Sequence, residues 1–173
     1  MNKYPVLTNL RSHLADKFSA LRMRALREVL WAKIIGRNID LATFPEEAPE
    51  KSPNRRFLGV TEIPVDRIVG TLNRQSDFDH KFRPLKSYLR DRWVNAYLAL
   101  QNGDWSPILV HQVGENYYVE DGHHRVSVAQ TLGLAYLQAR VWEYPQTAKE
   151  TKKCQPAPCP ERSPVKAYAR AAE

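Results

Sequence analysis

The sequence predicts a mixed α/β (α+β) fold: a compact domain with a small mixed sheet and flanking helices, preceded by a helical N-terminal extension. Three observations carry this prediction. Residues 57–144 alternate β-rich runs with helical periodicity, residues 8–36 repeat apolar side chains at helical spacing, and proline-rich stretches follow both segments. We therefore expect a basic helical extension with its connector at 1–56, the α/β domain at 57–144, and a disordered tail at 145–173.

The first expected element is a long helix, or a pair of helices, over residues 8–36. Thr8 or Asn9 would cap its start, and Gly36 would end it. Its basic side chains fit a helix packed on the main domain with a solvated cationic face, which we prefer, because apolar side chains recur three and four residues apart. The alternative is a basic amphipathic helix that contacts nucleic acid, a membrane surface or a partner. We expect Trp31 and Trp93 in the core.

Two elements are expected in the first half of residues 57–144. A strand runs from Val60 to Val65, and a turn follows it at Ile68-Val69. Pro84 is placed to open a helix whose apolar stripe ends near Gly103.

The second half of that segment is expected to hold a hairpin, a helix and a strand. The hairpin joins 108–113 to 117–120 through a turn that contains Gly114. The helix, residues 125–132, ends at Gly133, and residues 137–142 then alternate apolar and polar side chains as a half-buried strand does.

Composition excludes several classes of protein. The chain has 173 residues, 43% hydrophobic and 26% charged, so it can build one globular core. Its only cysteines, Cys154 and Cys159, cannot build a disulfide framework, and we expect no metal site there. No early segment reads as a signal peptide and no run is apolar enough to span a bilayer, so we expect a cytoplasmic protein without membrane contact.

The formal charge of +7 is unevenly distributed. Residues 1–60 carry 11 basic and 6 acidic side chains, residues 61–144 carry 9 and 10, and residues 145–173 carry 6 and 3. The excess therefore lies at the two flanks, which could hold the phosphates of DNA, whereas the middle is nearly neutral.

The most informative stretch joins a strand directly to a helix at Asp121-Gly-His-His-Arg125. Gly122 permits a backbone conformation that a side chain would forbid and allows a ligand to approach closely. The free amides of the helix start attract phosphate, and Arg125 adds a planar fork of donors. This turn therefore predicts an anion-binding site.

The same turn carries acid–base groups. His123 and His124 can donate protons near neutral pH or bind a metal, and Asp121 can orient a histidine or a cation. The alternative is that Asp121 merely caps the helix while both histidines face solvent. His111, in a strand, is expected to be packed, and His80, in a polar loop, to be solvated.

The motif Asp121-Gly-His-His-Arg125 resembles the glycine-x-x-arginine helix start of the ParB/sulfiredoxin superfamily. Residues 62–68, Asn73-Arg74 and 77–79 resemble its first strand and polar loop, and residues 106–110 the strand before the motif. The resemblance implies a compact nucleotide-binding fold with phosphates held at Gly122, His123, His124 and Arg125, and further contacts from Asn73 and Arg74.

Departures from the superfamily narrow what the resemblance implies. His123 and His124 stand where CTP-hydrolysing ParB proteins carry a glutamate and an arginine, and the tail leaves no room for a helix-turn-helix domain. His123 also replaces the catalytic cysteine of sulfiredoxins, so sulfiredoxin chemistry is not expected. The free-serine kinases have a more similar histidine motif, but their polar-loop glutamate has no evident counterpart among Asn73, Arg74, Asp77 and Asp79.

Three functions follow as hypotheses. The first choice is a phosphate-binding protein of this superfamily that is associated with DNA, through its basic N-terminal region and tail, as a regulator or nuclease-like protein. The alternatives are an ATP- or ADP-dependent phosphotransferase acting on a small hydroxyl substrate, and a non-catalytic module that responds to nucleotide. The expected ligand is a nucleoside di- or triphosphate with Mg²⁺, and the candidate catalytic residues are Asp121, His123 and His124.

Overall fold

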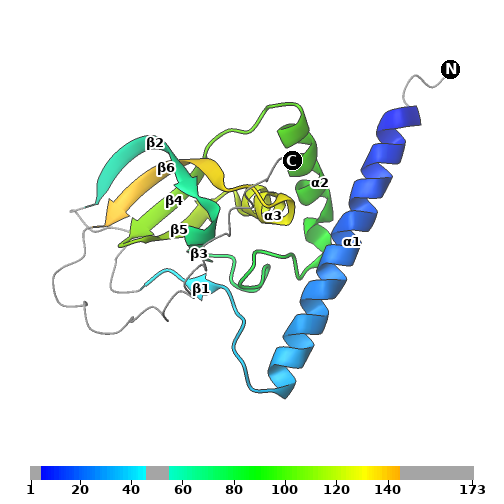
Figure 1. The fold of residues 1–173 in the computed structure, drawn as a ribbon, viewed down its shortest axis with the longest axis horizontal. Coiled ribbons are helices and arrows are strands. Elements are labelled where there is room, and N and C mark those ends of the chain that lie inside the picture. Colours follow the sequence, from blue (N-terminus) through cyan, green and yellow to red (C-terminus); the bar gives the residue numbers. More distant parts are fainter. Residues whose placement is uncertain (1–4, 46–54, 145–173) are drawn as a thin grey trace, which may run out of the picture.

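The computed structural model describes residues 5–45 and 55–144, and these form a sheet covered on one side by helices. The six-stranded sheet has the order β1-β3-β5-β4-β6-β2 and contains both parallel and antiparallel pairs. Helix α3 lies beside the sheet, α2 packs on α3, and α1 packs outside α2 (Figure 1). The expected mixed α/β fold class is confirmed. No helix in the described part of the chain is long and apolar enough to cross a membrane.

Helix α1 (Pro5–Ile34) is one continuous helix of 30 residues. It begins at Pro5, so Thr8 and Asn9 lie inside the helix and the predicted capping is wrong; proline is well tolerated in a first helical turn. Gly36 follows the helix with a φ of 68°, as expected of a helix stop.

The apolar stripe of α1 packs on the domain, as we preferred. Leu14 and Phe18 are buried, and Phe18 packs on Trp93 at 5.9 Å between ring centroids. The prediction that Trp31 belongs to the core is wrong, because its side chain is 63% exposed. Trp31 is one residue from the buried Ala32 and therefore points about 100° around the helix from the stripe.

A short strand that the sequence did not indicate, β1 (Ala42–Thr43), adds the N-terminal region to the sheet. It pairs in parallel with β3 (Ile68–Thr71), where only a turn was expected at Ile68-Val69. Gly70 makes this pairing feasible, since a Cβ there would lie 2.4 Å from the carbonyl oxygen of Ala42. Leu41, directly before β1, joins the buried cluster that also contains residues of α1 and α2.

The remaining strands lie close to the positions predicted from the sequence. Strand β2 (Arg56–Pro64) pairs antiparallel with β6 (Tyr136–Tyr144) and leads through a short 3₁₀ turn into β3. Strands β4 (Ile108–Val113) and β5 (Asn116–Asp121) form the predicted hairpin, and β4 also pairs in parallel with β6.

The helix predicted to open at Pro84 starts later. Pro84 forms a bridge with Phe78, a 3₁₀ turn covers Ser87–Leu89, and only then does α2 (Arg90–Gln101) begin. The prediction is wrong because the backbone before α2 forms a narrow loop instead of a helix: the amide of Leu85 donates to the carbonyl of Asp77 at 2.8 Å, and the amide of Asp79 donates to the carbonyl of Arg83 at 3.1 Å. Helix α3 (His123–Leu132) ends at Gly133, which has a φ of 70°, as predicted.

An ion cluster fixes that loop to α1. Arg83 lies 2.6 Å from the carboxylate of Glu28 on α1 and 2.5 Å from the buried carboxylate of Asp79. Hydrogen bonds from Arg83 and Lys81 lower the pKa of Glu28 to about 2. His80 is half-buried rather than solvated, with Nε2 4.0 Å from Glu28.

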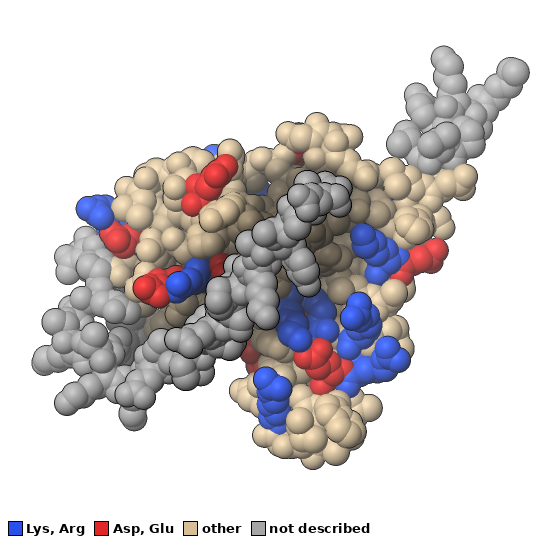
Figure 2. Space-filling view, in the orientation of Figure 1, with Lys and Arg blue, Asp and Glu red and all other residues tan. Residues whose placement is uncertain are grey.

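Charged side chains gather on this side of the molecule, over the C-terminal half of α1 and the segment beside it (Figure 2). The predictions for the connector and tail fall on residues 46–54 and 145–173, which lie outside the described residues, as do Cys154 and Cys159.

Candidate functional site

A cavity of about 570 Å³ lies at the N-terminus of α3. Its walls come from the loop after β3, the end of β5, the start of α3 and one face of α2. It brings together every predicted site residue: Asn73, Arg74, Asp121, Gly122, His123, His124 and Arg125. The residues singled out from the sequence therefore line one cavity, although the roles of several differ from expectation.

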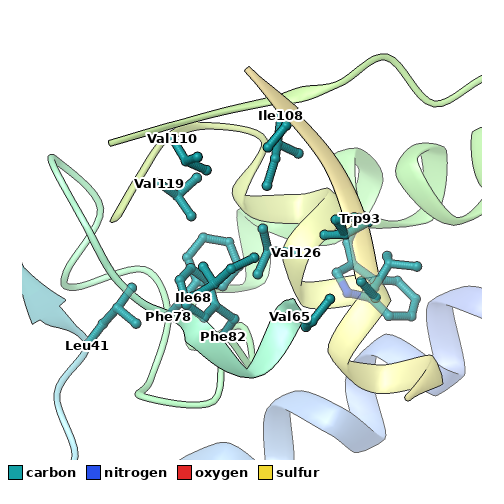
Figure 3. Close-up of a cluster of buried hydrophobic side chains, with 14 of the residues drawn as sticks. Leu41, Val65, Ile68, Phe78, Phe82, Trp93, Ile108, Val110, Val119 and Val126 are labelled. Carbon is teal, nitrogen blue, oxygen red and sulfur yellow. The ribbon is translucent and has the colours of Figure 1, made fainter. Parts of the chain in front are cut away.

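Tightly packed apolar side chains support the floor of the cavity. Phe78, at the cavity wall, belongs to the buried cluster that also holds Phe82 and Ile68, and Val126 of α3 packs into the same cluster (Figure 3). Phe78 contacts both histidine rings, stacking on His123 at 5.9 Å and meeting His124 edge-on at 5.7 Å between centroids. The rings are thus held in place by packing.

Gly122 forms the sharp turn from β5 into α3. Its φ of 104° belongs to the left-handed region, and a Cβ would lie 2.5 Å from Cγ2 of Ile108. The expected conformational reason for glycine holds, and the group that comes close to it is Ile108 of β4. The amide of Val126 donates to the Gly122 carbonyl at 3.0 Å, so the amides of residues 123–125 begin the helix without a partner in the helix itself.

His123 is buried and hydrogen-bonded to Thr71, a residue that the sequence analysis missed. Nε2 lies 2.6 Å from Oγ1 of Thr71, which also accepts the amides of Asn73 and Arg74 at 3.2 and 3.1 Å. The hydroxyl also lies 3.4 Å from the carbonyl oxygen of Val119, but the much shorter distance to a neutral Nε2 makes that nitrogen the better acceptor of its single proton. Burial, then the positive charges of Arg74 and a protonated His124, lower the pKa of His123 to about 4.

His124 is half-buried, and its Nε2 atom is buried without a hydrogen-bond partner among the described residues. Burial, followed by the positive charges of Arg92 and Arg74, lowers its pKa to about 4. Both histidines are therefore neutral near pH 7. They cannot donate a proton as imidazolium ions there, but a neutral ring still has one donor and one acceptor nitrogen.

Arg125 is tied to the protein more tightly than a free phosphate clamp would be. Its Nη1 donates to Oγ of Ser106 at 2.9 Å, to the carbonyl of Pro107 at 3.2 Å and to the carbonyl of Ser106. Its Nη2 donates to Asp121 at 2.7 Å. Arg125 thus fastens the start of β4 to the start of α3, and Asp121 is paired with this arginine instead of orienting a histidine or capping α3.

Arg74 and Asn73 reach the cavity from the loop after β3. Arg74 donates to the buried carboxylate of Asp77 at 3.0 Å, which also accepts the hydroxyl of Tyr88. Burial alone would raise the pKa of Asp77, but these hydrogen bonds outweigh it and lower the pKa. Asp77 and Asp79 are therefore both engaged, and neither is a free base at the site.

Arg92, on the first turn of α2, is the second residue that the sequence analysis missed. It lines the cavity and makes no hydrogen bond or ion pair within the described residues. It lay inside the predicted helix as one of several charged positions, and no local signal separated it from the solvated ones. Only the packing of α2 on α3 brings its charge to His124.

The cavity wall does not form a protein-only metal site. No group of three or more His, Cys, Asp or Glu side chains with metal-ligand geometry occurs in residues 5–45 and 55–144. A divalent ion here would need most of its ligands from a bound phosphate and water, as is usual for Mg²⁺.

Taken together, the turn, the two missed residues and the neutral histidines define a polar cavity at a helix N-terminus. No protein-family model matches the chain, and no curated protein matches it. Among solved structures, the crystal structure of sulfiredoxin from Arabidopsis thaliana is similar to it, with 25% sequence identity and a TM-score of 0.36. The match covers 47% of this chain and 82% of that chain.

Proposed function

We propose that this chain binds the phosphate groups of a nucleotide in the cavity at the N-terminus of α3. One observation supports this most strongly: Arg74 from the loop after β3 and Arg92 from α2 line the cavity beside the unpartnered Nε2 of His124, which lies in the first turn of that helix. The amides at the helix start and the positive end of its dipole favour an anion at this position.

The histidines contribute as neutral hydrogen-bonding groups. In the tautomer that carries its proton on Nε2, His124 can donate to a phosphate oxygen, which would satisfy a polar atom that is otherwise buried alone. Arg92 would supply the strongest new contact, because its guanidinium has no partner to give up in the part of the chain that the structure describes. Mg²⁺ would enter with the phosphates.

Transfer of the phosphoryl group to a hydroxyl substrate is a narrower version of the same proposal. It needs a group that accepts the proton of that hydroxyl, and Asp121, Asp77 and Asp79 are all paired. The neutral Nε2 of His124, in the tautomer protonated on Nδ1, is a cavity atom able to accept it.

Thermal unfolding with ligands tests the binding proposal. We expect ATP, ADP, CTP or GTP with Mg²⁺ to raise the melting temperature of the protein, as any ligand specific for the folded state does. Arg92→Gln should abolish the shift without lowering the melting temperature of the free protein. Arg67→Gln is the matched control, since Arg67 is an exposed arginine paired with Glu115, and it should keep the shift. If none of the four nucleotides stabilises the protein, the proposal is wrong.

Arg125→Ala is a poor probe of binding, although the motif points to this residue. Removing its guanidinium also leaves the carbonyls of Ser106 and Pro107 without their donor. A loss of nucleotide binding in that variant would therefore not separate a phosphate contact from a displaced α3.

A second candidate function is association with nucleic acid through α1. Its last turns and the residue just beyond carry four basic side chains with no ion pair in the described part of the chain: Arg24, Arg27, Lys33 and Arg37. We expect duplex DNA to bind with an affinity that falls with salt, and replacing three of these by glutamine (Arg24, Arg27 and Lys33) to flatten the salt dependence. Unchanged binding by that variant would remove α1 from the interface.

A further inference from the structure

A chain of three hydrogen-bonded side chains crosses neighbouring strands and ends at the same cavity. His111 of β4 lies between Tyr144 of β6 and Glu120 of β5, with Nδ1 3.0 Å from the tyrosine hydroxyl and Nε2 2.6 Å from Oε2 of the glutamate. The adjacent Val110 and Val119 point into the core beneath the helices. Because side chains alternate along a strand, this chain lies on the opposite face of the sheet.

The middle residue of this hydrogen-bonded series, His111, is sealed from solvent. His111 is 1% exposed, and the ring of Phe44 packs edge-on against it and against Tyr144, at centroid distances of 5.6 and 5.3 Å. A buried histidine in such surroundings needs partners for both ring nitrogens, and here it has them. The expectation that His111 is packed is thus confirmed.

The direction of these hydrogen bonds follows from the chemistry of the groups. A carboxylate can only accept, so Nε2 of His111 carries the proton and donates to Glu120. In the neutral ring, Nδ1 then accepts from the hydroxyl of Tyr144. Both donors point along this series toward Glu120, which fixes the position of its carboxylate.

Glu120 is the residue of this series that also lines the cavity. Its side chain is 40% exposed, and only Oε2 is engaged by His111, which leaves Oε1 without a hydrogen-bond partner among the described residues. Asp121, its neighbour, is already paired with Arg125. Asp104 also lines the cavity, but it is exposed and no buried group supports it.

We infer that Glu120, held by His111 and Tyr144, is the subsite that accepts hydrogen bonds from the non-phosphate part of the ligand, from a sugar hydroxyl or an amino group of a base. The inference rests on the proposed function. A carboxylate repels phosphate, so the anionic part of the ligand is directed toward Arg74 and Arg92 and the neutral donors toward Glu120. The basic side of the cavity and the Glu120 side therefore favour a single orientation of a bound nucleotide, with its phosphates toward the arginines.

Titration calorimetry with two classes of ligand tests this inference. Inorganic tripolyphosphate carries only the phosphate part, and the best-binding nucleoside triphosphate carries both parts. We expect the nucleotide to bind the wild-type protein more tightly than tripolyphosphate. Glu120→Gln should weaken nucleotide binding about 10-fold or more, the usual effect of losing a charged hydrogen bond. It should not weaken tripolyphosphate binding, which is expected to be equal or tighter because a negative charge is removed from the cavity.

Two further variants distinguish a ligand subsite from general effects on structure or on net charge. Tyr144→Phe keeps the ring and removes the first donor of the chain, so it should reduce the preference for nucleotide over tripolyphosphate; a purely structural role would weaken both ligands equally. Asp104→Asn removes a negative charge from the same cavity and should keep the preference. The 2′-deoxy and 3′-deoxy nucleotides, and a nucleotide whose base lacks the amino group, identify which donor Glu120 accepts.

The possible failures are distinguishable. If tripolyphosphate binds but nucleotides bind no more tightly, or if Glu120→Gln binds nucleotides as the wild type does, the subsite is wrong while phosphate binding stands. An equal loss in Asp104→Asn would also overturn it, because net charge would then explain the effect. If neither ligand binds, the proposed function fails and the subsite fails with it.

Discussion

The hydroxyl oxygen of Thr71 lies 2.6 Å from Nε2 of His123 and joins the end of β3 to the start of α3. The same oxygen accepts the amides of Asn73 and Arg74, so one buried hydroxyl holds both the motif helix and the loop that faces it. This hydroxyl therefore links the position of Arg74 directly to that of His123.

Thr71→Val should therefore destabilise the fold, although the side chain keeps its shape. Two amides and a ring nitrogen lose a partner in a site where Thr71 is fully buried, and each unsatisfied group costs about 1–3 kcal/mol. We expect the free energy of unfolding in urea to fall by about 2 kcal/mol or more. Thr71→Ser, which keeps the hydroxyl, should lose about 1 kcal/mol for its missing methyl group; equal losses in the two variants would show that the hydrogen bonds do not matter.

Stability should fall as the pH falls from about 6.5 to about 4. The pKa values of His123 and His124 are lowered from 6.5 to about 4 in the folded protein, so the unfolded chain binds more protons in this interval. The contribution is complete above pH 6.5 and lost as the pH falls through 4. We expect about 1–3 kcal/mol from the pair, after discounting for the partial exposure of His124.

Unfolding free energies measured between pH 7 and 4 check this prediction. The variant in which both histidines are replaced by asparagine should show a flatter profile over that interval. Glu28 acts in a separate window, because its pKa is lowered from 4.5 to about 2 and its contribution disappears only below about pH 4.5. A wild-type profile that is already flat from pH 6.5 to 4.5 would contradict the lowered histidine pKa values.

Gly122→Ala should be more damaging than Gly133→Ala. Both glycines have a positive φ, 104° and 70°, but a Cβ at Gly122 would also overlap Ile108, whereas Gly133 has open space around it. We expect a loss of about 1 kcal/mol for Gly133→Ala from backbone strain and at least about 2 kcal/mol for Gly122→Ala from strain and overpacking. Chemical denaturation of both variants gives the comparison, and similar losses would mean that Ile108 moves aside freely.

Glu28→Gln should weaken the attachment of α1 to the domain. Glu28 accepts from both Lys81 and Arg83, and Arg83 is mostly buried and bridges onward to Asp79. We expect a loss of about 1 kcal/mol and faster amide hydrogen exchange in α1. Glu115→Gln breaks an ion pair of similar length to Arg67, but this pair is exposed and should contribute less than about 0.5 kcal/mol. Equal effects of the two substitutions would argue against the bridging role of Arg83.

Much of the architecture could be predicted from local patterns. The stripe on α1, the hairpin of β4 and β5, the alternation in β6 and the glycines that end the helices are properties of neighbouring residues, and each was recognised. The helix start at Pro84 was misplaced, since the loop before α2 is held by ion pairs between residues far apart in the sequence. Strand β1 was missed because two residues carry no periodicity.

The residues of the candidate site also fall into two groups, those that the local sequence indicates and those that it does not. The turn at Asp121 to Arg125 was found because its residues are contiguous and their chemistry is visible in one line of sequence. Thr71, Arg92 and Glu120 looked like ordinary positions of a strand or a helix, and Trp31 looked like a core residue.

The sequence by itself determined which elements form and which turn carries the polar groups. Only the tertiary structure decided that Arg125 fastens β4 while Arg92 finds no ion-pair partner among the described residues, that both histidines are neutral, and that His111 supports Glu120. The physical reason is that the charge and hydrogen bonding of a side chain depend on neighbours brought together by packing, whereas helices and strands are largely decided by residues close along the chain.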